Sequence, residues 1–160
     1  MLSLARPIFP DDDGSADPRL GTALATYEQS RELPAVLQAL PGVRLLVPVV
    51  AVRGDDMAPA AGDKGDDMAA VLLTGADGRT ALLAFSNLRS LLTWKADARP
   101  VPVLTQQVAA AAKAEGATAI VLDVAGPVAV VVEESDLLHL AAGDTLVRTR
   151  AGLAWARQGA

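Results

Sequence analysis

Residues 67–94 constrain the fold more than any other part of the chain, because they specify a β-hairpin followed directly by a helix. Two apolar runs, residues 68–73 and 80–85, lie on either side of a short polar segment. The turn-forming residues of that segment are Gly75, Asp77 and Gly78. Such residues supply the positive φ angles of tight hairpin turns, so the two runs are predicted to pair as antiparallel strands.

The helix that follows is indicated by a candidate cap and by the spacing of leucines. Ser86 stands where an N-cap residue is expected. Leu88, Leu91 and Leu92 then fall at positions i, i+3 and i+4, which predicts that they share one buried helical face. All these residues are architectural, so the run indicates a fold far better than it indicates a chemistry.

Length and composition favour one compact domain. A chain of 160 residues can bury one substantial core but is short for two domains. Apolar residues make up 51% of the chain and aromatic residues only 3%, so the core must consist of small and branched aliphatic side chains. A core of this kind suits helices layered on a sheet.

Charge and cysteine content exclude several classes of function. The formal net charge of -5 argues against nucleic acid or an anionic membrane as a partner. The sequence has no cysteine, which rules out disulfides, thiol nucleophiles and thiolate metal sites. It also shows no signal-like N-terminus and no apolar run of about 20 residues, so we expect a cytoplasmic protein without a membrane span.

The N-terminal third is predicted to hold an arm and a helix. Residues 1–16 combine prolines with consecutive aspartates and are interpreted as an extended arm. Asp17 followed by Pro18 is typical of a helix start, and apolar residues then recur at helical spacing over residues 18–29.

A second short helix and a strand are predicted next. Pro34 begins the helix, and residues 41–42, a Pro-Gly pair, end it. Residues 43–52 form a valine-rich run that is predicted to be a strand. Because Pro48 lacks the N–H that a ladder hydrogen bond requires, this strand is interpreted as an edge strand rather than one with a bulge.

The second half of the chain repeats the order of strand and helix. Residues 99–103 are predicted to be extended, and Thr105 is predicted to cap an alanine-rich helix over residues 106–115. Residues 119–123 and 128–132 are predicted to form a second hairpin.

A last helix and a tail complete the chain. The helix is predicted to carry Leu137, Leu138 and Leu140 and to end at Gly143. Trp155 lies among arginines in the segment that follows, a composition common at interfaces, and we expect it to dock on the body, on a second copy or on a partner.

These elements predict an α+β domain with a mixed, mainly antiparallel sheet of about five strands and helices packed mostly on one face. The domain is expected to span residues 17–143, with an extended N-terminal arm over residues 1–16 and a C-terminal tail over residues 144–160.

Several motifs together resemble a known family. They are the run L-L-V-P-V-V-A from residue 45, K-G-D-D-M and the hairpin-helix segment after it, R-P-V-P-V from residue 99, and A-I-V-L-D-V-A-G-P-V from residue 119. Over roughly residues 11–140, the chain resembles the N-terminal domain of the SseB family, named for an enhanced serine sensitivity phenotype, in its single-domain actinobacterial form. The matching features are Lys64, Asp67, Met68, Phe85-Ser86, Trp94, Arg99-Pro100 and Gly126-Pro127. The resemblance implies no catalytic activity and no cofactor, and nothing attributed to the second domain of longer members is expected to transfer.

Candidate binding residues flank the hairpin and helix of residues 67–94. Residues 53–66 are predicted to form a long loop, and function concentrates on loops that a rigid scaffold holds. The residues predicted to contribute to a recognition surface are Lys64, Asp66, Asp67, Trp94 and Arg99.

Three other candidate sites are weaker. The spacing of Asp11, Asp13 and Asp17 around Gly14 is similar to a calcium loop, but the acid that should complete it is absent, so helix capping is the preferred interpretation of Asp17 and no metal site is predicted. Ser86 stands at a strand-to-helix junction, like a nucleophile elbow, but it lacks a supporting motif. The only histidine, His139, has no polar partner suggested by spacing and is interpreted as a partly exposed helix residue.

The sequence therefore predicts a non-enzymatic protein-interaction or regulatory domain that uses no cofactor and binds an unidentified protein partner through an edge strand and the Lys64 loop. The alternative, suggested by the phenotype in the family name, is a small-molecule sensor of an amino-acid-like ligand or a minor enzyme linked to serine metabolism. Homo-oligomerisation is compatible with either.

Overall fold

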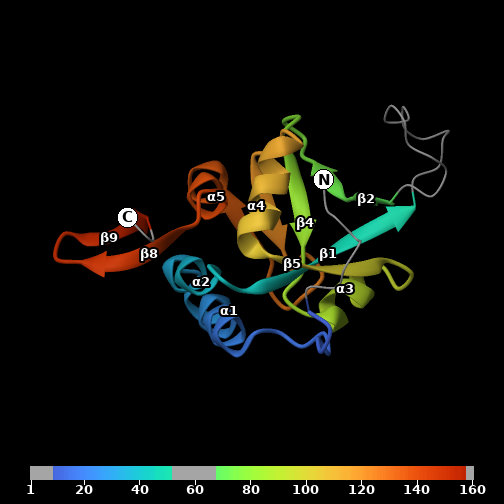
Figure 1. The fold of residues 1–160 in the computed structure, drawn as a ribbon, viewed down its shortest axis with the longest axis horizontal. Coiled ribbons are helices and arrows are strands. Elements are labelled where there is room, and N and C mark those ends of the chain that lie inside the picture. Colours follow the sequence, from blue (N-terminus) through green and yellow to red (C-terminus); the bar gives the residue numbers. More distant parts are fainter. Residues whose placement is uncertain (1–8, 52–67, 158–160) are drawn as a thin grey trace.

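The computed structural model describes residues 9–51 and 68–157, which form five helices and nine strands. The helices are α1 (Pro18–Ser30), α2 (Pro34–Ala39), α3 (Leu88–Trp94), α4 (Thr105–Ala114) and α5 (Glu134–Ala141). The strands are β1 (Arg44–Ala51), β2 (Met68–Ala70), β3 (Leu72–Thr74), β4 (Thr80–Ala84), β5 (Arg99–Leu104), β6 (Ala119–Leu122), β7 (Val130–Glu133), β8 (Asp144–Thr149) and β9 (Gly152–Arg157). The predicted α+β class is confirmed, and the strands are divided among several small sheets (Figure 1).

Two of these sheets are joined. One has the order β2-β1-β5 and is antiparallel; the other has the order β3-β4-β6-β7. Leu46 of β1 and Phe85, just after β4, exchange two backbone hydrogen bonds of 2.8 Å, which link the sheets. Only Val71 separates β2 from β3, so one stretch of chain pairs first with β1 and then with β4. The predicted hairpin is therefore confirmed for residues 72–74 and wrong for residues 68–70, which pair with β1.

The pairing of β4 with β6 is parallel, whereas the other named strand pairs in the described residues are antiparallel. The chain crosses from β4 to β6 through α3, β5 and α4. Because the two strands run in the same direction, their carboxyl ends meet at one edge of the sheet. In sheets with parallel strands such an edge is a common place for a ligand site.

The two faces of the joined sheet are covered unequally. Helices α1, α2, α4 and α5 contribute to one large core cluster with alternate residues of β1, β4, β5, β6 and β7, which defines the inner face. Helix α3 packs on the other, outer face, in a small cluster around Phe85 and Leu91. Helices therefore lie mostly on one face, as the sequence predicts.

The edge-strand interpretation of β1 is wrong. Strand β1 lies in the middle of its sheet, with β5 on one side and β2 on the other. Leu46 is bonded to Phe85, and pairing with β2 begins only at Val49. Pro48 lies opposite Pro100 of β5, in a pair whose backbone groups point away from each other. On its other side it falls between Phe85 and β2, so its missing N–H removes no hydrogen bond from either pairing.

The predictions that Thr105 caps α4 and that Ser86 caps α3 are also wrong, although both helices form where expected. Thr105 is the first residue of α4, and its buried hydroxyl donates to the carbonyl of Val43 at 2.9 Å. The cap of α3 is Asn87, whose side chain accepts from Ser90 N at 2.8 Å. By contrast, Asp17 caps α1 as predicted, since its carboxylate accepts from Arg19 N at 2.9 Å.

The leucines of the helical pattern are not all buried. Leu91 is fully buried under α3, whereas Leu92 is 38% exposed and lies outside the core clusters. In α5, Leu137 and Leu140 are buried and Leu138 is exposed. Helix α3 therefore buries a narrower stripe than the spacing predicts.

The segment expected to be a tail contains a hairpin. Strands β8 and β9 pair over six residue pairs from Asp144–Arg157 to Thr149–Gly152, and the hairpin extends from the body beside α2 and α5 (Figure 1). At the other end of the described chain, Asp12 of the N-terminal segment forms an ion pair with Arg44 at 2.7 Å. The N-terminal segment is thereby tied to the start of β1.

Candidate functional site

The binding residues predicted from the sequence do not form one described site. Lys64, Asp66 and Asp67, with the loop of residues 53–66, lie outside the described residues. Trp94 is half-buried on the outer face, with its ring centroid 5.8 Å from that of Phe85. Arg99 is exposed and has the strand parity of Val101, which belongs to the inner core, so it faces away from the cluster of Trp94. A binding role for these residues stays a prediction.

Part of the outer face beyond α3 is apolar and open. The register of β3, β4, β6 and β7 places aliphatic side chains side by side across the four strands. We call this surface the open face and define it by Leu73, Ala81, Val121 and Val131. Val131 is 41% exposed, and the other three are half-buried.

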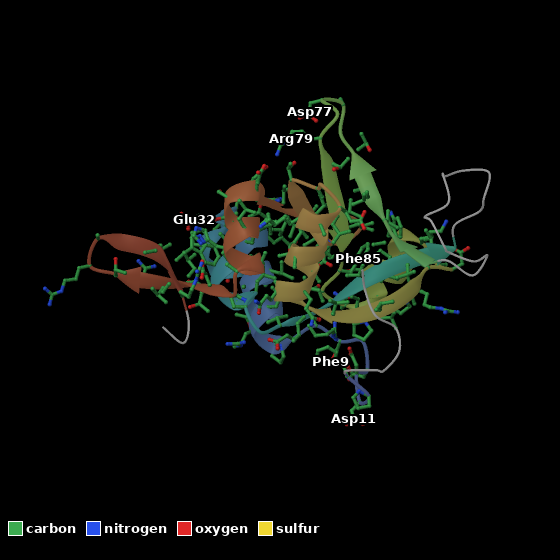
Figure 2. All side chains as sticks on the ribbon, turned by 45° about the horizontal axis from the view of Figure 1, so that its top comes forward. Phe9, Asp11, Glu32, Asp77, Arg79 and Phe85 are labelled. Atoms are coloured by element: carbon green, nitrogen blue, oxygen red, sulfur yellow. The ribbon has the colours of Figure 1, made fainter. Side chains whose placement is uncertain are left out.

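Polar residues border the open face. Arg79 and Glu133 form an ion pair of 3.0 Å across the ends of β4 and β7, and Asp77 lies at the hairpin tip near Arg79. Figure 2 shows Asp77 and Arg79 at the end of the β3–β4 hairpin, well away from Phe85 near the centre of the molecule. A shallow hollow of about 240 Å³ lies over these residues and the open face.

A second candidate site lies where the carboxyl ends of β4 and β6 meet. Ser86 follows β4 and Asp123 follows β6. The carboxylate of Asp123 accepts two hydrogen bonds from Ser86, one from the backbone N–H at 2.7 Å and one from the hydroxyl at 2.6 Å. Asn87 adds a hydrogen bond of 3.1 Å from its amide to the hydroxyl of Ser86. Ser86 is therefore not a helix cap but part of a buried polar network.

The backbone around Asp123 is unusual. Asp123 has φ 57°, in the left-handed region that few residues other than glycine adopt. A Cβ placed on Gly126 would lie 3.3 Å from the carbonyl oxygen and 3.2 Å from the Cβ of Asp123, so glycine allows a close approach at that position. Backbone strain of this kind often occurs at functional sites.

Burial raises the pKa of Asp123, and the hydrogen bonds from Ser86 oppose that rise. Desolvation disfavours the charged form of a carboxyl group, and neutral donors compensate only partly. The surroundings of Asp123 therefore favour the neutral form of its carboxyl group more than water does.

The Asp123 network borders a hollow of about 220 Å³ between α1 and the start of α3. Its wall includes Leu24, Glu28, Ser90 and Val128. Leu24 and Val128 give it an apolar side, and the carboxylates of Glu28 and Asp123 give it a negative one. The arrangement can hold a small molecule but shows no nucleophile and base pair of the kind that catalysis by Ser86 would need, because the described residues place no histidine or lysine beside it.

Sequence reasoning interprets Ser86 as a helix cap and misses its partner, Asp123. The two residues are 37 positions apart and meet only because β4 and β6 pair in parallel. Two of the motifs on which the sequence resemblance rests, Phe85-Ser86 and Gly126-Pro127, converge at this point. That convergence is the signal that could have directed attention to Asp123.

A third polar cluster holds the β8–β9 hairpin on α5. Asp144 bonds to Nδ1 of His139 at 2.7 Å and to Nε of Arg157 at 3.0 Å. The ring of His139 stacks on Trp155 with centroids 4.9 Å apart, and Trp155 Nε1 donates to Asp136 at 3.3 Å. His139 is partly exposed, as predicted, but it has a polar partner that its spacing did not suggest.

Metal and membrane sites are not supported by the described residues. No cluster of three or more potential metal-binding side chains occurs in residues 9–51 and 68–157. The aspartates near Gly14 are used locally, since Asp13 accepts from Ser15 and Asp17 caps α1. None of the described helices is both long and apolar enough to cross a membrane.

Comparison with known proteins gives one match. A family model described as the SseB protein N-terminal domain matches residues 20–139. No curated protein and no solved structure matches the chain. The matched region includes both the open face and the Asp123 network and ends before the β8–β9 hairpin.

Proposed function

Because residues 20–139 match the N-terminal domain of the SseB family, the chain belongs to that family, and on that premise we make the following proposal. We propose that the chain is a non-enzymatic interaction or regulatory domain of the cytoplasm that binds a partner protein through the open face. The observation that carries this proposal is the row of aliphatic side chains that α3 leaves uncovered. Residues that point to the water-exposed face of a sheet are normally polar, whereas Leu73, Val121 and Val131 are apolar.

The border of the open face resembles that of a protein interface. The apolar centre is bordered at one end by the Arg79–Glu133 ion pair and by Asp77. Interfaces combine an apolar centre with a polar rim, and contiguous exposed apolar surface often marks them. The partner that fits is an amphipathic segment of another protein with aliphatic side chains at its centre.

Strand addition at β5 is a poorer way to bind that partner. The register pairs Val47 with Val101 and Leu45 with Val103, so backbone groups of Pro100 and Pro102 face outward. Proline has no N–H to donate, which leaves this edge without donors at both positions. The proposed contact therefore uses the sheet face and not the β5 edge.

A charge placed on the open face tests the proposal. Val131→Glu adds a carboxylate at an exposed strand position, and Val147→Glu adds the same charge at a matched exposed valine of β8. In a crosslinked lysate pull-down, a stoichiometric partner should be recovered by the wild type and by Val147→Glu and lost by Val131→Glu. Failure to recover any stoichiometric partner, or its retention by Val131→Glu, would contradict the proposal.

Self-association is tested by a separate measurement on the same variants. If the partner is a second copy, light scattering at several concentrations should show a mass that increases with concentration. Val131→Glu should then restore the monomer mass, and Val147→Glu should not.

A second candidate function is sensing of a small amino-acid-like molecule, and the hollow beside Asp123 favours it. A ligand that binds the native state raises the melting temperature by an amount that grows with the logarithm of the ratio of its free concentration to its Kd. Thermal-shift measurements with serine and related metabolites should give a dose-dependent rise. A flat panel would remove this candidate and leave the first unaffected.

A further inference from the structure

The hollow between α1 and α3 contains a carboxylate that no described cation neutralises. Asp123 is 5% exposed, and both of its hydrogen bonds come from neutral groups of Ser86. The ion pairs found in residues 9–51 and 68–157 do not include it. Buried carboxylates are seldom left without a positive partner, because desolvation of the charge is expensive.

The rest of the wall adds negative charge and apolar surface. Glu28 of α1 is a second carboxylate at the hollow, and no lysine, arginine or histidine is among its described lining residues. Leu24, Ala25 and Val128 are apolar. A ligand that carries a carboxylate would meet two like charges, whereas a cation with a short apolar body would complement both parts of the wall.

Ser90 provides an independent indication of a polar ligand. Its side chain lines the hollow and its residue is only 8% exposed. Its backbone N–H bonds to Asn87, but within the described part of the chain no hydrogen bond is made by its hydroxyl. The hydroxyl oxygen is not sealed from solvent, so it is available to accept a hydrogen bond from a molecule in the hollow.

The size and donor count of an ammonium group match these acceptors. An ammonium group has three N–H donors and no acceptor. The carboxylate of Asp123 and the hydroxyl of Ser90 offer acceptors at the same hollow. A volume of about 220 Å³ is smaller than that of a drug-sized site, so only a small molecule fits.

A purely structural role explains the Asp123–Ser86 hydrogen bonds but not the surroundings. A clasp between two strand ends could use neutral side chains, as Thr105 does when it bonds to Val43. Burial raises the pKa of Asp123, because desolvation disfavours the charged form more than the hydrogen bonds from Ser86 favour it.

We infer that this hollow binds a small organic primary ammonium ion, with Asp123 as its counter-ion, Glu28 as a second negative charge and Ser90 as a hydrogen-bond acceptor. The inference rests on the small-molecule hollow of the second candidate function but changes its ligand from an amino-acid-like molecule to a monoamine, because the negative wall disfavours the carboxylate of a zwitterion. It does not depend on the open face.

The test is a titration followed by ¹H–¹⁵N NMR with three branched C4 probes of similar size that differ in charge: isobutylamine, isobutanol and isobutyrate. Isobutylamine should shift the amide signals of Ser86, Ser90 and Val128 in a saturable manner. The neutral alcohol and the anion should leave them almost unchanged, because neither can neutralise Asp123.

Variants separate the charge of Asp123 from its role in the fold. Asp123→Asn keeps a hydrogen-bond acceptor and removes the charge, and it should weaken isobutylamine binding by at least about tenfold, as expected for loss of a hydrogen bond to a charged group. Glu28→Gln, an exposed change, should weaken binding by about threefold, in the range of an exposed ion pair. Glu32→Gln, which removes an exposed carboxylate just beyond α1 and outside the hollow, is the matched control and should have no effect.

The outcomes of these experiments distinguish the ammonium site from the broader proposal that the hollow binds a small molecule. Equal binding of isobutanol and isobutylamine, or unchanged binding of isobutylamine by both Asp123→Asn and Glu28→Gln, would overturn the ammonium site and leave small-molecule binding intact. Absence of saturable shifts with all three probes, together with a flat metabolite panel, would remove both. If Asp123→Asn does not fold, Glu28→Gln and Ser90→Ala still decide the question, since both should weaken binding of the amine.

Discussion

Asp123 and Asp144 are buried to the same extent and have opposite surroundings. Each is 5% exposed. The guanidinium of Arg157 and the ring of His139 bond to Asp144 and hold the pKa of its carboxyl below the usual range, whereas burial raises the pKa of Asp123. Both carboxylates accept two hydrogen bonds, but only Asp144 accepts them from groups that carry or can carry positive charge.

The difference teaches how to separate a clasp from a site. Asp144 joins the end of α5 to both strands of the hairpin, and its charge is balanced within the chain. Asp123 also joins distant segments, but its charge is balanced by nothing described and it faces a hollow. Hydrogen bonds alone would place the two in one class, while charge balance places them in different ones.

The largest expected effect comes from removal of the Asp123 side chain. Asp123→Ala leaves the buried N–H and hydroxyl of Ser86 without their acceptor. Each unsatisfied buried donor costs about 1 to 3 kcal/mol, so urea denaturation should show a loss of about 2 to 4 kcal/mol. Asp123→Asn, which keeps an acceptor, should lose clearly less. Equal losses for the two variants would mean that the charge, and not the hydrogen bonds, supports the fold.

Removal of the Asp144 side chain should have a local effect. Asp144→Ala frees Arg157 and His139, which lie on opposite sides of the junction between α5 and the hairpin. Amide exchange in β8 and β9 should accelerate, and Trp155 fluorescence should shift to the red as its stacking on His139 loosens. Arg148→Ala, at an exposed position of the same hairpin, should change neither. Unchanged exchange in Asp144→Ala would show that the hairpin is held by Trp155 alone.

The two carboxylates should make opposite contributions to the pH dependence of stability. The pKa of Asp144 is lowered by folding, so its contribution is present above the unfolded value of about 3.9 and is lost as pH falls through the folded pKa. The pKa of Asp123 is raised by folding, so stability is lost as pH rises from the unfolded value through the folded pKa.

Urea midpoints of Asn variants between about pH 3 and 7 measure these contributions. The deficit of Asp144→Asn relative to the wild type should grow as pH rises. The deficit of Asp123→Asn should shrink over the same interval. Parallel pH profiles for the two variants would contradict the comparison.

The smallest effect is expected at Ser90. Because its hydroxyl makes no described hydrogen bond, Ser90→Ala should change the free energy of unfolding by no more than about 0.5 kcal/mol. Ser86→Ala, which removes a buried hydrogen bond to Asp123, should cost about 1 kcal/mol or more. A large loss in Ser90→Ala would show that its hydroxyl supports the fold and is not kept for a ligand.

Local signals were sufficient for much of the fold. The hairpin of β3 and β4 forms around Gly78, which has φ 84°, and Asp17 caps α1, because turn and cap preferences act over a few residues. The helices and the second hairpin also form close to their predicted bounds. The predicted dominance of one helix-covered face followed from the same periodicity.

Tertiary pairing was not readable from those signals. Pro48 suggested that β1 is an edge strand, but β1 is central. Its partner changes from Phe85 to β2 near Pro48, so the missing N–H of proline removes no hydrogen bond there. The parallel pairing of β4 and β6, which creates the Asp123 network, depends on a crossover of more than thirty residues. The β8–β9 hairpin had a local signal, the run Thr145 to Thr149 of β-forming residues, which the neighbouring arginines obscured.

The most direct test of the difference between Asp123 and Asp144 is a ¹³C NMR titration of their side-chain carboxyl groups. The structure predicts that Asp123 titrates above the usual carboxyl value of about 3.9 and Asp144 below it, and that isobutylamine lowers the pKa of Asp123 without moving that of Asp144. A pKa of Asp123 at or below the usual value, unaffected by the amine, would mean that the fold itself balances the charge and would contradict the account.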